Sequence, residues 1–544
     1  MNIRRTVPLV FLAATLVFLY PSVGPVQLVR IDKGPPGLEE IFKARAVEVV
    51  QELATCYLGR LDREAVLALR SSGVPVTVLD QDVADKIYLL VRPESARTAA
   101  DLQKRGRVIP LEPGTLLFWA EAGDPSAALP PGLPRKLLPS SSIVSHLRGY
   151  PKAPPTARAA VRDPRVATIV SWVSKDNLKA LIKNLQDFGT RYTGTAGCDA
   201  AATFIHNYLH WSGVEAEVQE FSAGGLTSRN VVGHVLGRAF PDDVVIVCAH
   251  YDSTSTAPET LAPGADDNAS GVAAVMEAAR ILARFPTDYT VQFLAVSGEE
   301  QGLYGSTAYA RGITHTDRRI VGVVNLDMIA YADAMPEDLD VFVNDPSSWM
   351  GDRLSQDAAA YAGLSVRARV DPSMVYSDHS PFWDLGFSAL LAIEDVPLHS
   401  PYYHETGDTL DTLNLDFCAQ AAKAALATVA VLAQPVGLGP LPPVEIEARS
   451  SFFSSFLSTR KNIYLSWTPS PGVAGYNVYR TDIPYNYQEK INDRLVTDPK
   501  YVDRGVESET RHFYVITAVG QDGLESNFSR QVEVSPVPPK EGTE

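Results

Sequence analysis

The sequence predicts an α/β domain at the centre of the chain, in which helices flank a mostly parallel mixed sheet. Continuous apolar runs are typical of strands buried on both faces of such a sheet, and they occupy residues 244–249, 290–296, 320–326 and 388–393. Helical patterns alternate with these runs at residues 198–211, 269–285 and 416–433. Strands that alternate with helices in this way indicate one α/β domain over residues 166–435.

Length and charge limit the classes of protein to consider. The chain has 544 residues, which is enough for about three domains of about 150 residues each. Its 64 acidic and 48 basic residues give a net charge of −16, whereas a nucleic-acid-binding protein is expected to carry a basic stripe. We therefore expect no nucleic-acid partner.

The first 30 residues are typical of an export signal. A basic start, MNIRR, precedes an apolar run from Val7 to Tyr20, as in a secretory signal peptide. Pro25 directly follows the small residues Ser22 to Gly24, which makes a poor cleavage site. A cleaved signal and an uncleaved membrane anchor both remain open, and either one predicts a secreted or periplasmic protein.

Residues 31–122 predict a small α/β segment before the central domain. The pattern at residues 40–54 indicates a helix, and the patterns at 75–79 and 86–91 indicate strands. Residues 123–165 are rich in proline, which is typical of an extended linker.

A β-sandwich is predicted for residues 444–538, after a short linker at residues 436–443. Short alternating strands are separated by turn signals in this region. Its aromatic side chains, such as Trp467, are expected in the core.

The four cysteines are Cys56, Cys198, Cys248 and Cys418, and they lie far apart with no CxxC pair. This spacing excludes a small disulfide scaffold and a thiolate zinc site.

Polar side chains follow three of the apolar strands of the central domain. His250 and Asp252 follow the first, Glu299 and Glu300 follow the second, and Asp327 follows the third. Ligands of open α/β sheets bind at the carboxyl ends of the strands. We therefore expect these side chains to meet in one site.

Two further stretches add candidates to this site. GADDNASG contains Asp266 and Asp267, and YYHETGDTL contains His404. Imidazole and carboxylate without thiolate suit zinc, with manganese and cobalt as competitors. Clustered carboxylates repel one another without cations, which favours two metal ions bridged by one carboxylate. Asp266 itself is expected to be a solvated loop residue or a helix cap.

The sequence lacks the complete motifs of two other classes of hydrolase. His404-Glu405 resembles the start of HExxH, but Asp408 stands in the place of the second histidine. The chain also lacks the G-x-S-x-G elbow of one class of serine hydrolases.

The motifs HYDS, PGADDNASG, GEEQGLYGS, NLDM, SDHSPF and YHETGDTL, in this order, resemble the co-catalytic zinc aminopeptidases of clan MH, of the bacterial leucyl-aminopeptidase type. The resemblance covers about residues 166–434. It implies a zinc aminopeptidase-like fold with two zinc ions. His250 and Asp327 would hold one ion, Glu300 and His404 would hold the other, and Asp267 would bridge them.

The resemblance also implies roles for residues beside the metals. Glu299 would be the general base, and Asp252 would orient His250 through its second ring nitrogen. The peptide bond between Asp267 and Asn268 is expected to be cis. Tyr376 and His379 are candidates for binding substrate.

The C-terminal segment resembles a fibronectin type III module, which implies a spacer or a contact with a cell surface or polymer. The whole chain is thus expected to be an exported aminopeptidase that acts on peptides. A carboxypeptidase or a glutaminyl cyclase of the same fold, and a module without activity, remain alternatives.

Charge suggests a role for the part before the central domain. Residues 31–165 are net basic and the rest of the chain is acidic, so we expect this leader to dock on the peptidase domain and restrain it until removed. A permanent domain that helps folding or binds the envelope is the alternative.

Overall fold

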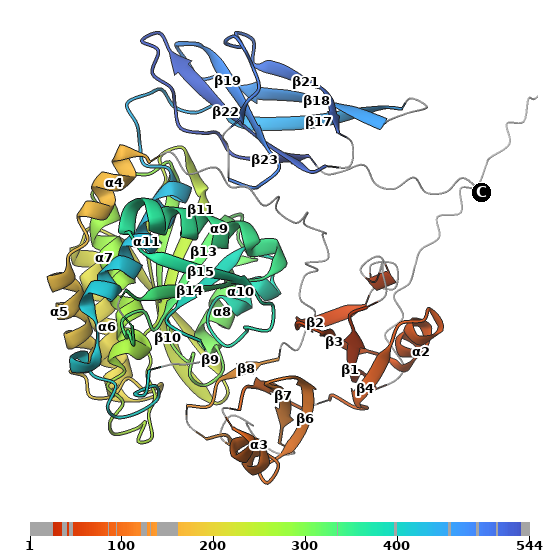
Figure 1. Ribbon diagram of the computed structural model, residues 1–544, viewed down its shortest axis with the longest axis vertical. Helices are drawn as coiled ribbons and strands as arrows, with labels where there is room; N and C mark the ends of the chain where they lie inside the picture. Colours follow the sequence, from red (N-terminus) through yellow and green to blue (C-terminus); the bar gives the residue numbers. More distant parts are fainter. Residues whose placement is uncertain are drawn as a thin grey trace, which may run out of the picture.

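The computed structural model describes residues 25–34, 38, 41–42, 47–84, 86–93, 95–120, 128–130, 132–138, 162–334, 336–396, 400–454, 459–485, 489–507 and 510–534. The apolar run of the predicted export signal lies outside these residues. Figure 1 shows three parts in chain order: an N-terminal segment in red and orange, a central α/β domain, and a C-terminal β-sandwich in blue.

The N-terminal segment contains two antiparallel sheets. The first has the order β2-β3-β1-β4, with β1 (Gln27–Asp32), β2 (Glu48–Glu52), β3 (Cys56–Leu61), β4 (Val76–Asp80) and helix α2 (Arg63–Ser71). The second has the order β6-β7-β5-β8, with β5 (Leu89–Val91), β6 (Arg107–Glu112), β7 (Thr115–Trp119), β8 (Arg135–Leu137) and helix α3 (Ala96–Leu102).

Three expectations for this segment need correction. The helix predicted at 40–54 is wrong in its second half, because residues 48–52 form β2 and pair with β3. Residues 27–30, which we assigned to the export signal, begin the first sheet instead. The predicted linker at 123–165 contains β8, which pairs with β5, and α4 already begins at residue 164. In each case pairing with a distant strand or a tertiary contact outweighs the local pattern.

The central domain is built on one mixed sheet of order β15-β14-β16-β13-β11-β12-β10-β9. Its strands are β9 (Glu215–Ala223), β10 (Leu226–Val235), β11 (Phe240–His250), β12 (Tyr289–Val296), β13 (Arg319–Asp327), β14 (Asp338–Val343), β15 (Ser365–Val370) and β16 (Ala389–Ile393). The four strands predicted from apolar runs are confirmed as parts of β11, β12, β13 and β16. These four pair in parallel with one another in the order β12-β11-β13-β16.

Helices cover both faces of this sheet. They are α4 (Pro164–Ser171), α5 (Lys175–Gln186), α6 (Ala196–Trp211), α7 (Gly271–Leu282), α8 (Tyr304–Ile313), α9 (Ser348–Asp357), α10 (Ser380–Asp384) and α11 (Leu415–Ala433). The side chains of α5, α6, α7 and α11 share one core, and those of α8 and α10 pack in another against the opposite face. The three predicted helices are confirmed as α6, α7 and α11.

Helix α11 is long and apolar enough to cross a membrane, the one such helix in the described part of the chain. However, 72% of its apolar window is buried inside the structure. Its alanine-rich surface packs against α4, α5 and α9, so it serves as a core helix of the central domain.

The C-terminal part consists of two packed sheets, β17-β18-β21 and β20-β19-β22-β23. The strands are β17 (Val444–Ser454), β18 (Thr459–Thr468), β19 (Val473–Thr481), β20 (Glu489–Lys490), β21 (Lys500–Glu507), β22 (His512–Gly520) and β23 (Val532–Val534). Trp467 is buried in their shared core, as expected.

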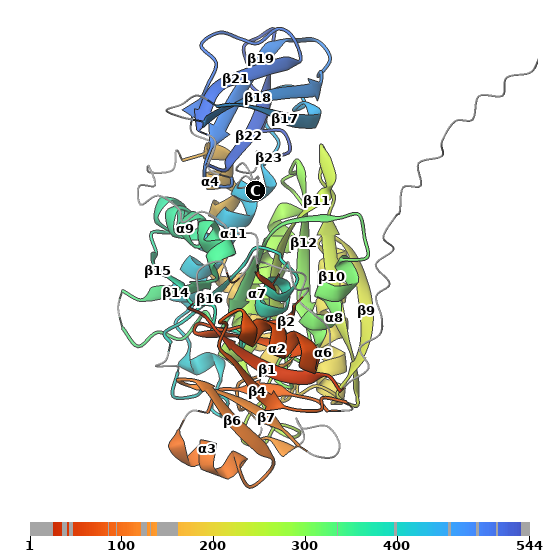
Figure 2. The same ribbon diagram turned by 90° about the vertical axis from the view of Figure 1, so that its right-hand side faces the viewer.

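The β-sandwich contacts the central sheet at the edge where β11 and β12 begin. Arg530 donates to Asp243 at 2.8 Å, and Asn527 donates to Asp288 at 2.6 Å. Both views place the sandwich at the end of the molecule away from the N-terminal segment (Figures 1 and 2). It is therefore remote from the carboxyl ends of the strands.

Candidate metal centre

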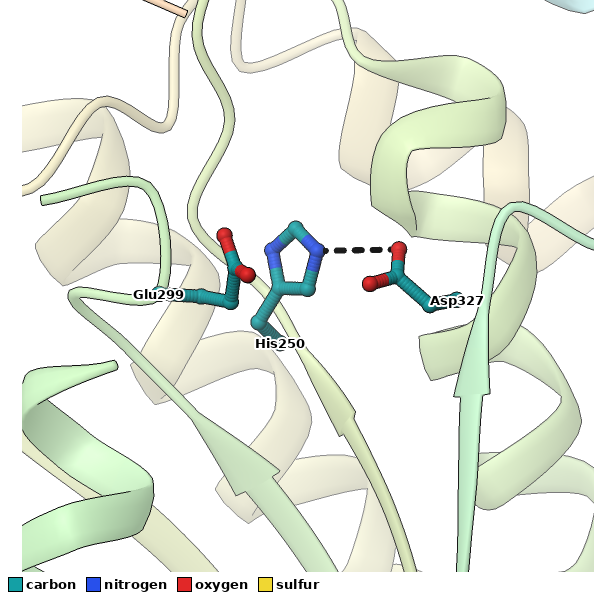
Figure 3. Close-up of side chains that lie close together, drawn as sticks. All are labelled: His250, Glu299 and Asp327. Atoms are coloured by element: carbon teal, nitrogen blue, oxygen red, sulfur yellow. Dashed lines mark hydrogen bonds and ion pairs between the residues drawn. The ribbon is translucent and has the colours of Figure 1, made fainter. Parts of the chain in front are cut away.

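Three adjacent parallel strands carry predicted site residues to one edge of the sheet. β11 ends at His250, β12 leads into Glu299 and Glu300, and β13 ends at Asp327. Because β11 pairs in parallel with both β12 and β13, the three carboxyl ends lie side by side. Figure 3 shows the imidazole of His250 between the side chains of Glu299 and Asp327.

Two loops supply the remaining candidates. Asp267 lies in the turn Ala265–Ser270 that leads into α7, and its peptide bond to Asn268 is cis, as the resemblance implies. The Asn268 side chain donates to the carbonyl of Leu326 in β13 at 2.8 Å, which ties this loop to the sheet. His404 lies in the loop between β16 and α11.

The carboxylate of Asp267 lies between two imidazoles. Nε2 of His250 is 3.3 Å from one oxygen of Asp267, and Nε2 of His404 is 3.0 Å from the other. His250 Nε2 also lies 3.2 Å from Asp327 Oδ1, and His404 Nε2 lies 3.3 Å from Glu300 Oε2. The five predicted ligands thus form two donor sets that share Asp267.

These separations suit zinc. Tetrahedral donors at about 2.0–2.1 Å from a zinc ion lie about 3.3 Å from one another. The other oxygen of Glu300, Oε1, is buried and has no hydrogen-bond partner among the described residues. Imidazole and carboxylate form a donor set that zinc accepts. The residues around Asp267 therefore fit divalent cations such as zinc.

Burial and neighbouring charges act on the pKa values of this site in opposite directions. Burial lowers the pKa of His404, but the carboxylates of Glu300 and Asp267 outweigh burial and raise it to about 10. Burial raises the pKa of Asp267, but His250 and His404 outweigh it and hold that pKa below its ordinary value. Burial, together with the Glu300 carboxylate, raises the pKa of Glu299 well above its ordinary value. Carboxylates packed this closely need protons or cations beside them.

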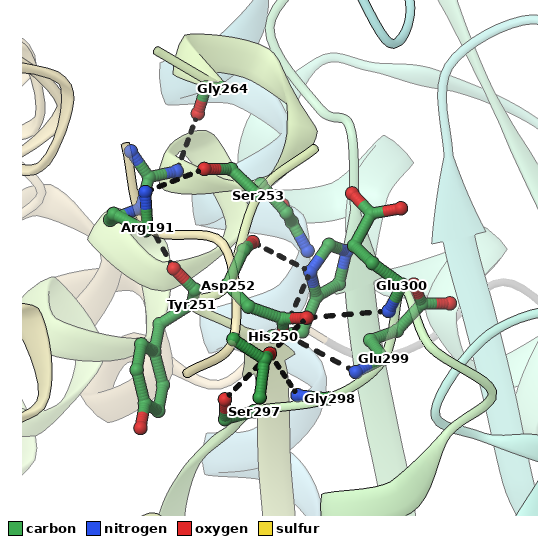
Figure 4. Close-up of polar contacts among 12 residues, drawn as sticks. Arg191, His250, Tyr251, Asp252, Ser253, Gly264, Ser297, Gly298, Glu299 and Glu300 are labelled. Atoms are coloured by element: carbon green, nitrogen blue, oxygen red, sulfur yellow. Dashed lines mark hydrogen bonds and ion pairs between the residues drawn. The ribbon is translucent and has the colours of Figure 1, made fainter. Parts of the chain in front are cut away.

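Asp252 positions two other parts of the site (Figure 4). Nδ1 of His250 lies 3.1 Å from the backbone carbonyl of Asp252 and 3.6 Å from its carboxylate. The carboxylate accepts the backbone N–H groups of Glu299 and Glu300, both at 3.3 Å, and the hydroxyl of Thr193 at 3.1 Å. Asp252 thus orients His250 mainly through its carbonyl and holds the Glu299–Glu300 turn with its side chain.

Three buried charged residues that hold the site were missed or misjudged from the sequence. Asp266, expected to be solvated, is only 2% exposed and accepts N–H groups of the chain after β13. Asp408 accepts the backbone N–H groups of Asp266 and Asp267 at 2.9 and 3.0 Å. Arg191 donates to the carbonyls of Tyr251 and Gly264 at 2.7 and 2.8 Å. Asp266 directly precedes the predicted ligand Asp267, which was a sequence signal that it lies at the site. No local sequence pattern links Asp408 or Arg191 to this loop.

The site opens into a cavity. Glu299 lines it beside the five candidate ligands. An apolar wall faces them, and it consists of Met328, Met374, Leu391, Ile393 and Val396. Arg92, Leu133, Pro134 and Arg135 of the N-terminal segment also line the cavity.

The two candidates for substrate binding differ in position. The ring of Tyr376 lines the cavity, and its hydroxyl lies 3.3 Å from that of Thr115 in the N-terminal segment. His379 is fully buried, its Nε2 lies 2.7 Å from the carbonyl of Met374, and its ring packs on Trp383. His379 is absent from the described cavity lining, because the start of α10 directs it into the core.

Known proteins with sequences similar to this chain include metallopeptidases. A protein of Pyrenophora tritici-repentis described as "Probable zinc metalloprotease" is 27% identical over 427 residues, which cover 67% of this chain and 86% of that protein. Leucine aminopeptidase 1 of Arthroderma otae is 27% identical over 289 residues, or 49% of this chain and 77% of that protein.

The fold has solved counterparts as well. The LapA aminopeptidase of Legionella pneumophila matches 65% of this chain and 99% of its own, with a TM-score of 0.51 and 18% identity. Residues 230–429, which contain all five candidate ligands and Glu299, match the sequence profile of peptidase family M28. The central domain is therefore similar to peptidase family M28 over residues 230–429.

Proposed function

We propose that this chain is a zinc-dependent aminopeptidase that binds two zinc ions and removes N-terminal residues from peptides. The observation that carries the proposal is the pair of donor sets that share Asp267, with Glu299 beside them in the same cavity. The similarity to proteins named as a zinc metalloprotease and a leucine aminopeptidase supports both the metal and the reaction.

Each candidate ligand has a defined part in holding the metals. His250 and Asp327 would hold one zinc ion, Glu300 and His404 would hold the other, and Asp267 would bind both. When bound, zinc polarises the scissile carbonyl and lowers the pKa of a water molecule. The backbone carbonyl of Asp252 faces Nδ1 of His250, so the N–H tautomer at Nδ1 leaves Nε2 free as a ligand.

The proton transfers fall to Glu299. Its carboxylate lines the cavity, and its oxygen lies within 4.8 Å of donor atoms of His250 and Asp327. Glu299 accepts the proton of the attacking water and delivers it to the nitrogen of the leaving amine.

The apolar wall of the cavity would receive the side chain of the residue that is removed. Met328 directly follows Asp327, which places this wall beside one donor set. Burial of apolar side-chain surface against Met328, Leu391 and Ile393 would favour residues such as leucine.

Export and the C-terminal module are part of the same proposal. The basic start and the apolar run at residues 7–20 support an exported, secreted or periplasmic enzyme, with an uncleaved anchor as the membrane-bound form. The two packed sheets β17–β23 support a fibronectin type III-like module that acts as a spacer or a surface contact. Sequencing the N-terminus of the protein recovered from medium, periplasm and membranes tests the export.

A peptide assay distinguishes the candidate activities. The full chain is freed of metal, reloaded with zinc, and given one peptide with a free and with an acetylated N-terminus, and the products are identified by mass spectrometry. We expect stepwise loss of N-terminal residues from the free peptide alone. Loss from the C-terminus would show a carboxypeptidase, and cyclisation of N-terminal glutamine without cleavage would show a cyclase. An unchanged peptide would refute a peptidase activity.

A further inference from the structure

The N-terminal segment is built into the wall of the substrate cavity. Lys136 of β8 forms an ion pair with Asp384 of α10 at 2.7 Å, and the two side chains are 2% and 10% exposed. The backbone carbonyl of Gly132 faces Nδ1 of His404. The ion pair is buried and the Gly132 contact involves a candidate metal ligand. The N-terminal segment therefore forms part of the site.

One cation from this segment reaches the cavity without a carboxylate partner. Arg92 directly follows β5, and its backbone N–H donates to the carbonyl of Pro134 at 3.0 Å. Arg92 is one of the residues that line the cavity, and its Nη1 lies 3.7 Å from the sulfur of Met374. In the described part of the chain, no carboxylate forms an ion pair with Arg92 within 4.0 Å.

Arg135, the other arginine of the wall, is engaged differently. It is buried, and it donates to the backbone carbonyls of Leu133 at 2.9 Å and Pro130 at 2.6 Å. These hydrogen bonds hold the chain just before β8, where Leu133 and Pro134 line the cavity. Arg135 therefore supports the segment, whereas the side chain of Arg92 lies beside the cavity against the sulfur of Met374.

The surroundings of Arg92 define what it can bind. Met374 belongs to the apolar cluster that also contains Met328, Leu391 and Ile393, so the guanidinium lies at the apolar side of the cavity. A partly desolvated guanidinium is favourable only when an anion or several acceptors face it. Its planar pair of N–H donors matches a carboxylate in a two-point contact.

Building on the proposed function, we propose that Arg92 is a specificity residue that binds a carboxylate of the peptide substrate. That carboxylate belongs either to an acidic side chain at the substrate N-terminus or to the free C-terminus of a short peptide. The sheet β5–β8 thus has a permanent part in recognition, in contrast to the removable inhibitor that the charge of residues 31–165 suggested.

Two pairs of substrates with and without the carboxylate test this role. L-Glutamyl p-nitroanilide is compared with L-glutaminyl p-nitroanilide, and leucylglycine is compared with leucylglycinamide, on the zinc-loaded full chain. For one pair we expect kcat/KM to favour the carboxylate member by about 10- to 100-fold, as for hydrogen bonds to a charged group. The pair that shows the preference identifies the source of the carboxylate.

Three variants connect the preference to Arg92. Arg92→Gln should bring the kcat/KM ratio within the pair close to one, mainly through KM, and Arg92→Lys should retain part of it. Arg97→Gln is the matched control, because Arg97 is an exposed arginine of the same segment, and it should keep the full ratio. Ratios near one in the unmodified chain, or a ratio that survives Arg92→Gln, would overturn the proposal.

A binding measurement separates this result from a failure of the proposed function. The same four compounds are titrated by calorimetry into the Glu299→Gln chain, with and without Arg92→Gln. Tighter binding of a carboxylate member that is lost with Arg92→Gln supports the role of Arg92 even if no compound is hydrolysed. Equal binding of both members overturns it, whatever the enzyme activity.

Discussion

The backbone carbonyl of Gly132 accepts a hydrogen bond from Nδ1 of His404, which lies 272 residues further along the chain. This contact joins the N-terminal segment to one of the two donor sets. It orients the imidazole so that Nε2 faces Asp267 at 3.0 Å and Glu300 at 3.3 Å. Partners of this kind typically change metal affinity by about 10- to 100-fold when they are lost.

Gly132→Ala should weaken the metal site at His404. A Cβ at this position would lie 2.6 Å from His404 Nδ1, and the backbone has a φ of +73°, which L side chains rarely adopt. We expect weaker binding of one zinc ion, measured by competition with a chelator. Gly114→Ala is the control, because φ is +82° there and no atom lies within 4 Å of the added Cβ. Equal zinc affinity in the two variants would contradict the role of Gly132.

Glu299→Gln should abolish turnover and leave the metal content intact. The amide keeps the shape of the side chain but cannot accept the proton, and Glu299 is not one of the five candidate ligands. Loss of a general base typically lowers the rate by about 10²- to 10⁴-fold. The measurements are kcat on leucyl p-nitroanilide and zinc per chain, and a near-normal kcat would remove Glu299 from this role.

Asp267→Asn should lower the affinity for both zinc ions, whereas His404→Ala should lower mainly one. A carboxylate between two cations neutralises both, and its two oxygens face His250 and His404. A terminal imidazole serves a single ion. Zinc per chain after dialysis checks this, and the same loss in both variants would speak against a bridging Asp267.

Lys136→Met should destabilise the docked N-terminal segment strongly. Removal of Lys136 leaves Asp384 buried without its partner, which typically lowers the free energy of unfolding by about 3–5 kcal/mol. Replacing both residues, Lys136→Met with Asp384→Leu, should recover much of the loss, because no unpaired charge remains. Thermal unfolding and limited proteolysis provide the measurement.

An exposed ion pair supplies the control for this experiment. Lys104 and Asp101 lie 2.6 Å apart, with side chains 76% and 46% exposed, and such exposed pairs contribute little to stability. Lys104→Met should therefore leave the unfolding curve nearly unchanged. A similar effect of Lys104→Met and Lys136→Met would show that the buried pair has no special part in docking.

A chain that ends near Pro440 should remain folded and active. All the candidate site residues precede this point, and the β-sandwich contacts the sheet at the edge opposite the site, through Arg530 and Asn527. Loss of these contacts exposes Asp243 and Asp288, so we expect a lower melting temperature with kcat/KM close to that of the full chain. A large fall in kcat/KM in a shortened chain that is still folded would assign the module a part in catalysis.

The sequence alone was sufficient for the four parallel strands at the centre of the sheet and for the residues at the ends of three of them. Apolar runs predicted β11, β12, β13 and β16, because strands buried on both faces must be apolar throughout. Parallel strands end at one edge of a sheet, so the neighbourhood of His250, Glu300 and Asp327 follows from the order of the strands. The strands follow from local sequence. The meeting of the site residues follows from the rule that adjacent parallel strands end at the same edge of a sheet.

Only the tertiary structure determined what surrounds that edge. The residues at 48–52 form a strand because β3 lies beside them, although their own pattern predicts a helix. Asp266 is buried because Asp408 and the chain after β13 enclose its loop. Arg92 and Gly132 reach the cavity because the N-terminal segment docks there through Lys136 and Asp384. Such contacts join residues far apart in sequence, and their free energy depends on packing and desolvation, which no local pattern records.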